Sequence, residues 1–254
     1  MTDKASDAAA RPFRRGRTAL ALIAVGLTGI ASLVPVLPPV EGVHWSILLV
    51  NPLLLLLIFA GLGALAAPQC GLASRIGFRV SGYPVSPVPP QAMRLIAAGI
   101  AAGVAIAFLD HATRGLWQPA PAAPPSLAEA WSPAALVLGV FYGGVVEEIT
   151  MRWGVMSLAV LVVWSAFARN ADAPPRAALA AGIVIAALVF AVGHLPALQA
   201  AGIAMEPPLV ARTLLWNGLL GIGFGVLFAA RDLESAMVAH AGFHVGVALA
   251  ANLT

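Results

Sequence analysis

Two adjacent carboxylates and three histidines stand in stretches of this sequence that are otherwise apolar. The carboxylates are Glu147 and Glu148, and the histidines are His194, His240 and His244. A central Asp, Lys or Arg costs about 2.5–3.5 kcal/mol in an apolar span, so ionisable groups kept there usually mark function. Carboxylates and imidazoles transfer protons near neutral pH. We therefore expect a site of general acid–base chemistry.

The spacing around the two glutamates separates their roles. On a helix, Glu148 and Arg152 are i,i+4 neighbours with the acid first, which favours an ion pair. Glu147 points about 100° away from Glu148 and lacks this local partner. Its carboxylate is then free to act as a base or an acid. The alternative is a charged helix end at the membrane interface.

The histidines have structural alternatives too. His194 ends an apolar run, where a single histidine can also be a hydrogen-bonded packing residue. His240 and His244 share one helix face and could bind a metal, donate to an oxyanion, relay protons or simply face the bundle interior. Three of the five histidines lie in apolar helices alongside the only Glu pair, which favours function. His44 and His111 fall in predicted loops and receive no role.

The composition describes a membrane protein. Hydrophobic residues make up 60% of the chain and charged residues 10%, whereas soluble domains carry about 25% charged residues. Several apolar runs reach the roughly 20 residues that cross a bilayer, and little strict alternation favours helices over a barrel. We predict an all-α, polytopic transmembrane bundle of about eight helices, with the site in an intramembrane cavity.

The apolar runs are separated by loops rich in proline or arginine. The predicted helices cover Thr18–Leu37, Ser46–Ala67, Ala92–Leu109, Pro133–Phe167, Ala177–His194, Leu209–Ala230 and Ser235–Ala251. The fourth run is longer than one span requires, so we divide it near Glu147–Gly154 into two helices. Two separate crossings give eight spans, one bent crossing gives seven, and both remain open. The spacing of Gly99 and Gly103 allows close helix packing.

Basic residues precede the first apolar run. They are Arg11, Arg14, Arg15 and Arg17. By the positive-inside rule they place the N-terminus in the cytoplasm, together with Arg75 and Arg79 after two spans. We predict a disordered basic tail over residues 1–17 and transmembrane helices 1–3 over residues 18–131. No soluble domain accompanies the cluster, so nucleic acid is not an expected partner. Cys70 is the only cysteine, which excludes an intrachain disulfide.

The order of these motifs resembles the CAAX protease and bacteriocin-processing family, also called the type II CAAX prenyl endopeptidase or ABI family. The matches are Glu-Glu-x-x-x-Arg at Glu147, Glu148 and Arg152, Phe-x-x-x-His at Phe190 and His194, and His-x-x-x-Asn at His240, where His244 takes the Asn position. The stretch Trp216–Gly225 also looks like the family's approach to the third motif. The resemblance covers about Ala134–Leu249 and implies a catalytic helical core over residues 132–254.

The resemblance implies an intramembrane, glutamate-dependent endopeptidase. Glu147 and His194 would activate a water molecule, and His240 with His244 would stabilise the oxyanion. The residues implied to hold the site in place are Glu148, Arg152 and Phe190. A neutral imidazole can donate one N–H as Asn does, so the change at position 244 need not remove its role.

A zinc site is the chemical alternative. Glu147, His194, His240 and His244 supply N and O ligands that zinc accepts. The His-Glu-x-x-His signature is absent, so we prefer metal-free chemistry that requires no cofactor. One geometric difficulty is that His194 ends a helix, whereas His240 lies near the start of the helix two further on. The two can meet only near mid-depth, in a water-filled cavity.

The expected partners are the lipid bilayer and a membrane-associated peptide or protein substrate. We expect an integral protein of the bacterial inner membrane. A non-catalytic membrane scaffold or immunity factor on the same fold is the competing function. A proton-coupled transporter ranks last, because paired broken helices in corresponding halves are absent. The substrate itself cannot be inferred from the sequence.

Overall fold

The computed structural model describes residues 12–37, 39, 41–117 and 124–253, and the regular elements among these residues are helices, without strands. Seven helical segments are long and apolar enough to cross a membrane. They are Arg15–Val36, Trp45–Cys70, Ala92–Ala112, Pro133–Phe167, Arg176–Ala200, Pro207–Ala230 and Leu233–Ala251. The protein is therefore a polytopic helical bundle, as the composition predicts.

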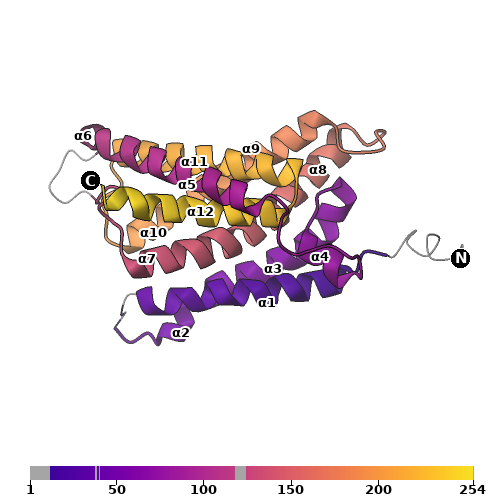
Figure 1. Ribbon diagram of the computed structural model, residues 1–254, viewed down its shortest axis with the longest axis horizontal. Helices are drawn as coiled ribbons and strands as arrows, with labels where there is room; N and C mark the ends of the chain where they lie inside the picture. Colours follow the sequence, from indigo (N-terminus) through magenta and orange to yellow (C-terminus); the bar gives the residue numbers. More distant parts are fainter. Residues whose placement is uncertain (1–11, 38, 40, 118–123, 254) are drawn as a thin grey trace, which may run out of the picture.

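The segments divide into labelled helices (Figure 1). Their bounds are α1 Arg15–Leu33, η1 Val34–Val36, α2 Trp45–Leu48, α3 Val50–Ala66, η2 Ala67–Cys70, α4 Arg75–Val80, α5 Ala92–Ala112, α6 Arg114–Trp117, α7 Pro133–Leu138, η3 Gly139–Met156, α8 Ser157–Phe167, α9 Arg176–Gly193, α10 Leu195–Ala200, α11 Pro207–Ala230 and α12 Leu233–Ala251.

Two predicted boundaries need correction. Pro133–Phe167 is one continuous 35-residue helical segment, so the division near Glu147–Gly154 is wrong and the seven-span alternative applies. No proline follows Pro133 within the segment, and an internal proline is the usual cause of a sharp break. The first helix begins at Arg15, so the tail predicted over residues 1–17 is shorter than expected. Residues 1–11 lie outside the described part of the chain.

Side-chain caps explain several helix starts. Ser132 accepts a hydrogen bond from the backbone N–H of Ala135 at 3.0 Å, and Pro133 occupies the first turn. Asp232 accepts from the N–H of Ser235 at 2.8 Å. Such caps satisfy backbone donors that a helix leaves unpaired. Because Asp232 is a cap, α12 begins at Leu233 rather than at the predicted Ser235.

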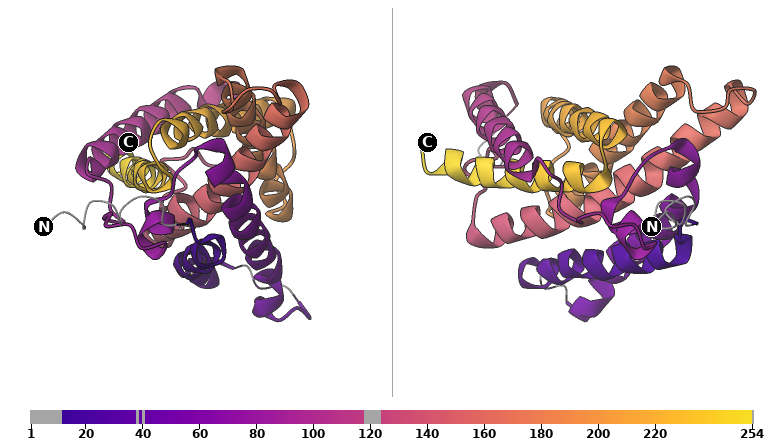
Figure 2. Two further views of the ribbon diagram at one scale, coloured as in Figure 1. Left: turned by 90° about the vertical axis from the view of Figure 1, so that its right-hand side faces the viewer. Right: turned by 45° about the vertical axis from the view of Figure 1, so that its right-hand side comes forward.

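The last helix, α12, lies in the interior of the bundle. It packs between α5, η3 and α11, and 67% of its span is buried, an arrangement that Figure 2 also shows. Glycines allow the close approach: a Cβ added at Gly242 would lie 2.6 Å from the backbone oxygen of Ile96, and one at Gly99 would collide with the backbone of Ala239. The predicted close packing at Gly99 and Gly103 is confirmed.

Candidate active site

The paired glutamates lie in a helix of unusual geometry. Gly139–Met156, which contains them, is a π-helix rather than the expected α-helix. Turns with i→i+5 bonding are rare and often occur at functional sites. Glu148 is fully buried, whereas the side chain of Glu147 keeps 23% of its surface exposed. The two neighbouring carboxylates therefore face different surroundings.

Glu148 connects two helices. Its Oε2 lies 3.3 Å from Nε of Arg152, and both side chains are 0% exposed. Its Oε1 lies 2.8 Å from Nδ1 of His240 on α12. The predicted i,i+4 pair is present despite the wider helix. The same carboxylate also fixes the orientation of an imidazole 92 residues away, which the spacing did not predict.

The charge of Arg152 is held between two aromatic rings. Its Cζ lies 4.7 Å from the ring centre of Phe190 on α9 and 5.6 Å from that of Phe224 on α11. Ring faces attract a guanidinium, most strongly where water is excluded. Phe224 also stacks on His240 at 4.4 Å with an interplanar angle of 19°. Phe190 thus contacts the buried charge directly, and Phe224 is a second such residue that the sequence did not single out.

His194 has a defined tautomer. Its Nδ1 lies 2.8 Å from the backbone oxygen of Phe190. A carbonyl oxygen only accepts hydrogen bonds, so Nδ1 carries the proton and Nε2 of the neutral ring is an acceptor. His194 separates α9 from α10, and the span continues to Ala200. This continuation places His194 inside the span and resolves the difficulty about depth.

His240 and His244 form a stacked pair, with ring centres 5.1 Å apart and an interplanar angle of 19°. Nε2 of His240 lies 4.0 Å from Oε2 of Glu147. Nε2 of His244 is buried and has no hydrogen-bond partner among the described residues. A Cβ at Gly143 would lie 2.7 Å from this atom, and one at Gly139 would collide with the same ring. These two glycines provide the space for an imidazole at position 244.

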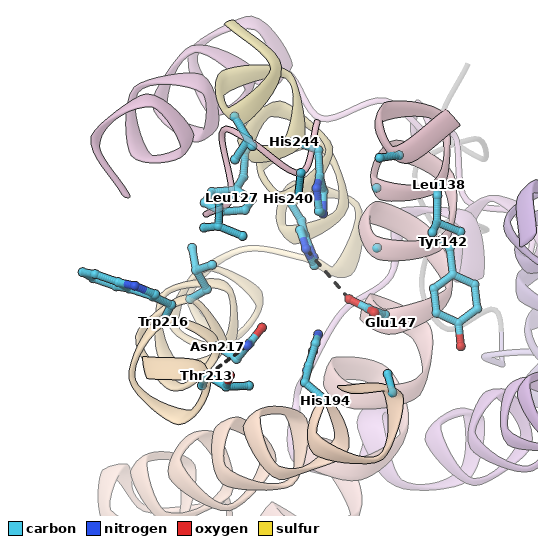
Figure 3. Close-up of a pocket in the computed structure, with 18 of the residues that line it drawn as sticks. Leu127, Leu138, Tyr142, Glu147, His194, Thr213, Trp216, Asn217, His240 and His244 are labelled. Atoms are coloured by element: carbon cyan, nitrogen blue, oxygen red, sulfur yellow. Dashed lines mark hydrogen bonds and ion pairs between the residues drawn. The ribbon is translucent and has the colours of Figure 1, made fainter. Parts of the chain in front are cut away.

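The four proposed catalytic side chains meet in one cavity. Glu147, His194, His240 and His244 line a pocket of about 400 Å³ with mainly apolar walls. Figure 3 shows them facing a common space from three different segments. The other labelled lining residues are Leu127, Leu138, Tyr142, Thr213, Trp216 and Asn217. The sequence placed these groups in separate motifs, and the fold brings them together.

Asn217 is a pocket residue to which the sequence gave no role of its own. Its Nδ2 donates to the backbone oxygen of Thr213 at 2.9 Å, and Figure 3 shows its side chain directed into the cavity. One amide donor and the carbonyl oxygen remain available to a substrate. The sequence feature that could have identified Asn217 is its position as a single carboxamide in an otherwise apolar helix.

A buried ion pair supports the far wall of the pocket. Asp110 is 0% exposed and accepts from Nε and Nη2 of Arg212 at 2.7 Å each. It also accepts from Trp216 Nε1 at 3.0 Å and from the N–H of Leu127 at 2.8 Å. The sequence assigned Asp110 to a loop, but α5 continues through it to Ala112. This carboxylate joins α5, α11 and the segment at Leu127.

The four residues considered for zinc do not form a metal centre in this arrangement. Within the described residues, no group of three or more His, Cys, Asp and Glu side chains is placed to hold a metal ion. Nδ1 of His194 and Nδ1 of His240 bind protein oxygens, which leaves Nε2 as the free nitrogen of each ring. We assign no reaction step to a metal.

Comparison with known proteins gives one match. Residues 129–246 match the family model described as type II CAAX prenyl endopeptidase Rce1-like. The matched range contains all three motifs and the whole set of catalytic candidates. None of the curated proteins and none of the solved structures matches the chain. Residues 129–246 of this membrane protein are therefore similar to the type II CAAX prenyl endopeptidase Rce1-like family.

Proposed function

We propose that this protein is an intramembrane endopeptidase that hydrolyses a peptide bond through a water molecule activated by Glu147 and His194. The observation that supports it most strongly is the meeting of these two residues with His240 in one cavity. The proposed substrate is a membrane-associated peptide or protein, and the proposed location is the bacterial inner membrane. The matched family description names a peptidase of the same reaction class.

Glu147 is the proposed general base. Its carboxylate is partly exposed inside the pocket and has no arginine partner, unlike that of Glu148. The water donates one proton to Glu147 and a hydrogen bond to Nε2 of His194, which is an acceptor because Nδ1 donates to Phe190. The water oxygen forms a bond to the carbonyl carbon of the substrate. Glu147 then transfers the proton to the leaving amine as the C–N bond breaks.

His244 and His240 are the proposed partners of the oxyanion. Nε2 of His244 is buried, free of protein partners among the described residues and directed at the cavity, so its N–H tautomer can donate to a negative oxygen. Nε2 of His240 becomes a donor when that ring is protonated, since Nδ1 is already bound to Glu148. One such donor contributes about 2.7–4 kcal/mol to catalysis in a known protease.

Glu148, Arg152 and Phe190 are proposed to position the reacting groups. Glu148 and Arg152 do so without touching the substrate, whereas Phe190 also lines the pocket. Glu148 and Arg152 are 0% exposed, so neither can reach a peptide in the pocket. Their contacts fix His240 and join η3 to α9 and α11. A reacting geometry held by such a buried network loses activity when the network is disturbed, even if the reacting groups are unchanged.

The proposal can be tested before the substrate is identified. The measurement compares the N- and C-termini of the proteins and peptides recovered from membranes, because each cleavage creates new termini. Cells would express the parent, Glu147→Gln or Glu206→Gln at equal levels. Glu206 is an exposed glutamate outside the pocket and serves as the matched control. We expect new termini that disappear in Glu147→Gln and persist in Glu206→Gln. Identical termini in all three would overturn the proposal, and an unchanged cellular phenotype would favour the scaffold or immunity factor.

A further inference from the structure

The catalytic pocket lies toward one end of the bundle. Most of its lining residues come from the first halves of the Pro133–Phe167 and Pro207–Ala230 segments and from the middle and later parts of Arg176–Ala200 and Leu233–Ala251. Because successive segments run in opposite directions, these parts all belong to the same end. That end carries α6, α10 and the end of α12, whereas α4 and the start of α1 lie at the other (Figure 1).

Arginines are distributed unequally between the two ends. The end without the pocket holds nine arginines, each in the first turn of a span or outside the spans: Arg14, Arg15, Arg17, Arg75, Arg79, Arg94, Arg169, Arg176 and Arg231. The pocket end holds Arg114 and Arg212. The loop bearing Arg169 and Arg176 joins the N-terminal end only because Pro133–Phe167 is one crossing. The sequence, read with eight spans, could not show this asymmetry.

The pocket end has no free cationic side chain among its described arginines. Arg114 pairs with Glu129 at 2.7 Å, and Arg212 pairs with Asp110 at 2.7 Å. Hydrogen bonds from Ser126 and the charge of Arg114 lower the pKa of Glu129, so this carboxylate stays ionised at neutral pH. Trp131, 36% exposed at the pocket, suits a membrane interface.

The opposite end offers free positive charge to a membrane surface. Arg14, Arg17 and Arg79 line a second cavity of about 270 Å³. These three side chains form no ion pair within the described residues, and the cavity lining includes no carboxylate. Polybasic groups beside a span favour the anionic cytoplasmic leaflet. Both the number and the pairing of the arginines therefore distinguish the ends.

We infer that the catalytic pocket opens on the non-cytoplasmic face of the membrane and takes substrate peptides from that side. The positive-inside rule places the arginine-rich end in the cytoplasm, and seven crossings then place the C-terminus and the pocket outside. The claim that a peptide substrate enters this pocket rests on the proposed function, whereas the orientation does not. It narrows the substrate class to segments of membrane-associated proteins or peptides exposed beyond the cytoplasmic face.

Cysteine labelling in intact cells tests the orientation. Gly115→Cys places a thiol on exposed α6, where an added Cβ has no atom within 4 Å. Asp172→Cys places one in the exposed loop at the arginine-rich end. The native Cys70 is 5% exposed and gives a low background. A membrane-impermeant maleimide should label Gly115→Cys in intact cells and Asp172→Cys only after permeabilisation.

The reverse labelling pattern would overturn the inference. Labelling of both thiols in intact cells would overturn it too, since the two sites would then share one face. A C-terminal fusion to alkaline phosphatase, active only outside the cytoplasm, gives an independent reading and should be active. Neither assay involves cleavage, so a reversed orientation leaves the proposed chemistry standing. Conversely, cleavage that persists in Glu147→Gln would refute the chemistry and leave the orientation intact.

Discussion

Two buried carboxylate–arginine pairs contact residues that line the pocket, and they differ in how completely their hydrogen-bonding groups are satisfied. Asp110 receives four hydrogen bonds, two of them from Arg212. Glu148 meets Arg152 at 3.3 Å and shares its carboxylate with His240 at 2.8 Å. The Asp110 carboxylate, whose hydrogen bonds all go to residues around the pocket wall, has a structural role. The Glu148 carboxylate also binds an imidazole and can therefore orient a reacting group. The difference separates structural charge from charge that serves the chemistry.

Among the residues that support the reacting groups, the largest effect is expected from Glu148→Gln. The change leaves the fully buried Arg152 without its counter-charge and weakens the hold on His240. Breaking one side of a buried pair costs about 3–5 kcal/mol, so both the free energy of unfolding and activity should fall strongly. Thermal unfolding in detergent and cleavage by the remaining folded protein would be measured. Unchanged activity per folded molecule would remove Glu148 from the catalytic network.

Replacement of His244 is the next largest test. His244→Leu removes a donor and should reduce kcat by about 100- to 1,000-fold, as loss of an oxyanion donor does elsewhere. His244→Asn matches the motif of the related family and should stay within about 10-fold of the parent, because Asn also offers an N–H. Equal kcat values for the Leu and parent proteins would show that this ring does not reach the oxyanion.

Asp110→Asn should separate binding from chemistry. Arg212 keeps 12% exposure and can recruit water, so we expect a stability loss of about 1–3 kcal/mol, smaller than for Glu148→Gln. The wall formed by Trp216 and Leu127 would loosen, which should raise KM and leave kcat nearly unchanged. Steady-state kinetics would be measured after correction for folded protein. A fall in kcat with constant KM would contradict a purely supporting role.

The smallest expected effect comes from Gly143→Ala. An added Cβ would lie 2.7 Å from Nε2 of His244, so the ring must shift, and we expect kcat to fall by about 10-fold, or 1.4 kcal/mol. Combined with His244→Asn, whose smaller side chain needs less space, the same change should cost less. Gly115→Ala is the matched control, with no neighbour within 4 Å. Additive losses in the double variant would argue against steric coupling.

The sequence predicted those contacts that are local. The Glu148–Arg152 pair follows from i,i+4 spacing, and membrane spans follow from apolar runs and proline or aspartate at their ends. It could not predict that Phe190 and Phe224 cover Arg152, because those rings come from separate helices. The continuity of Pro133–Phe167 was also hidden, since its 35 residues exceed what one span requires and the sequence does not show whether the chain crosses the membrane once or twice there.

The same limit applies to the rim of the pocket. Asp110 lies 102 residues from Arg212 in the chain, so the sequence alone made it an unremarked loop residue. Gly139 and Gly143 carry no chemistry, and their importance for position 244 is visible only when the facing ring is placed. The small glycines make room for the larger ring at position 244. Such complementary sizes at distant positions arise from packing in the folded protein and cannot be inferred from a single sequence.

The most direct test of the central claim is single-turnover cleavage by purified protein in liposomes, using a substrate identified from the membrane termini. Parent and Glu206→Gln proteins should cleave at the same rate. Glu147→Gln, with an unchanged melting temperature, should cleave about 100- to 10,000-fold more slowly, the usual contribution of a general base. Cleavage by folded Glu147→Gln at the parent rate would contradict the claim that Glu147 activates the water.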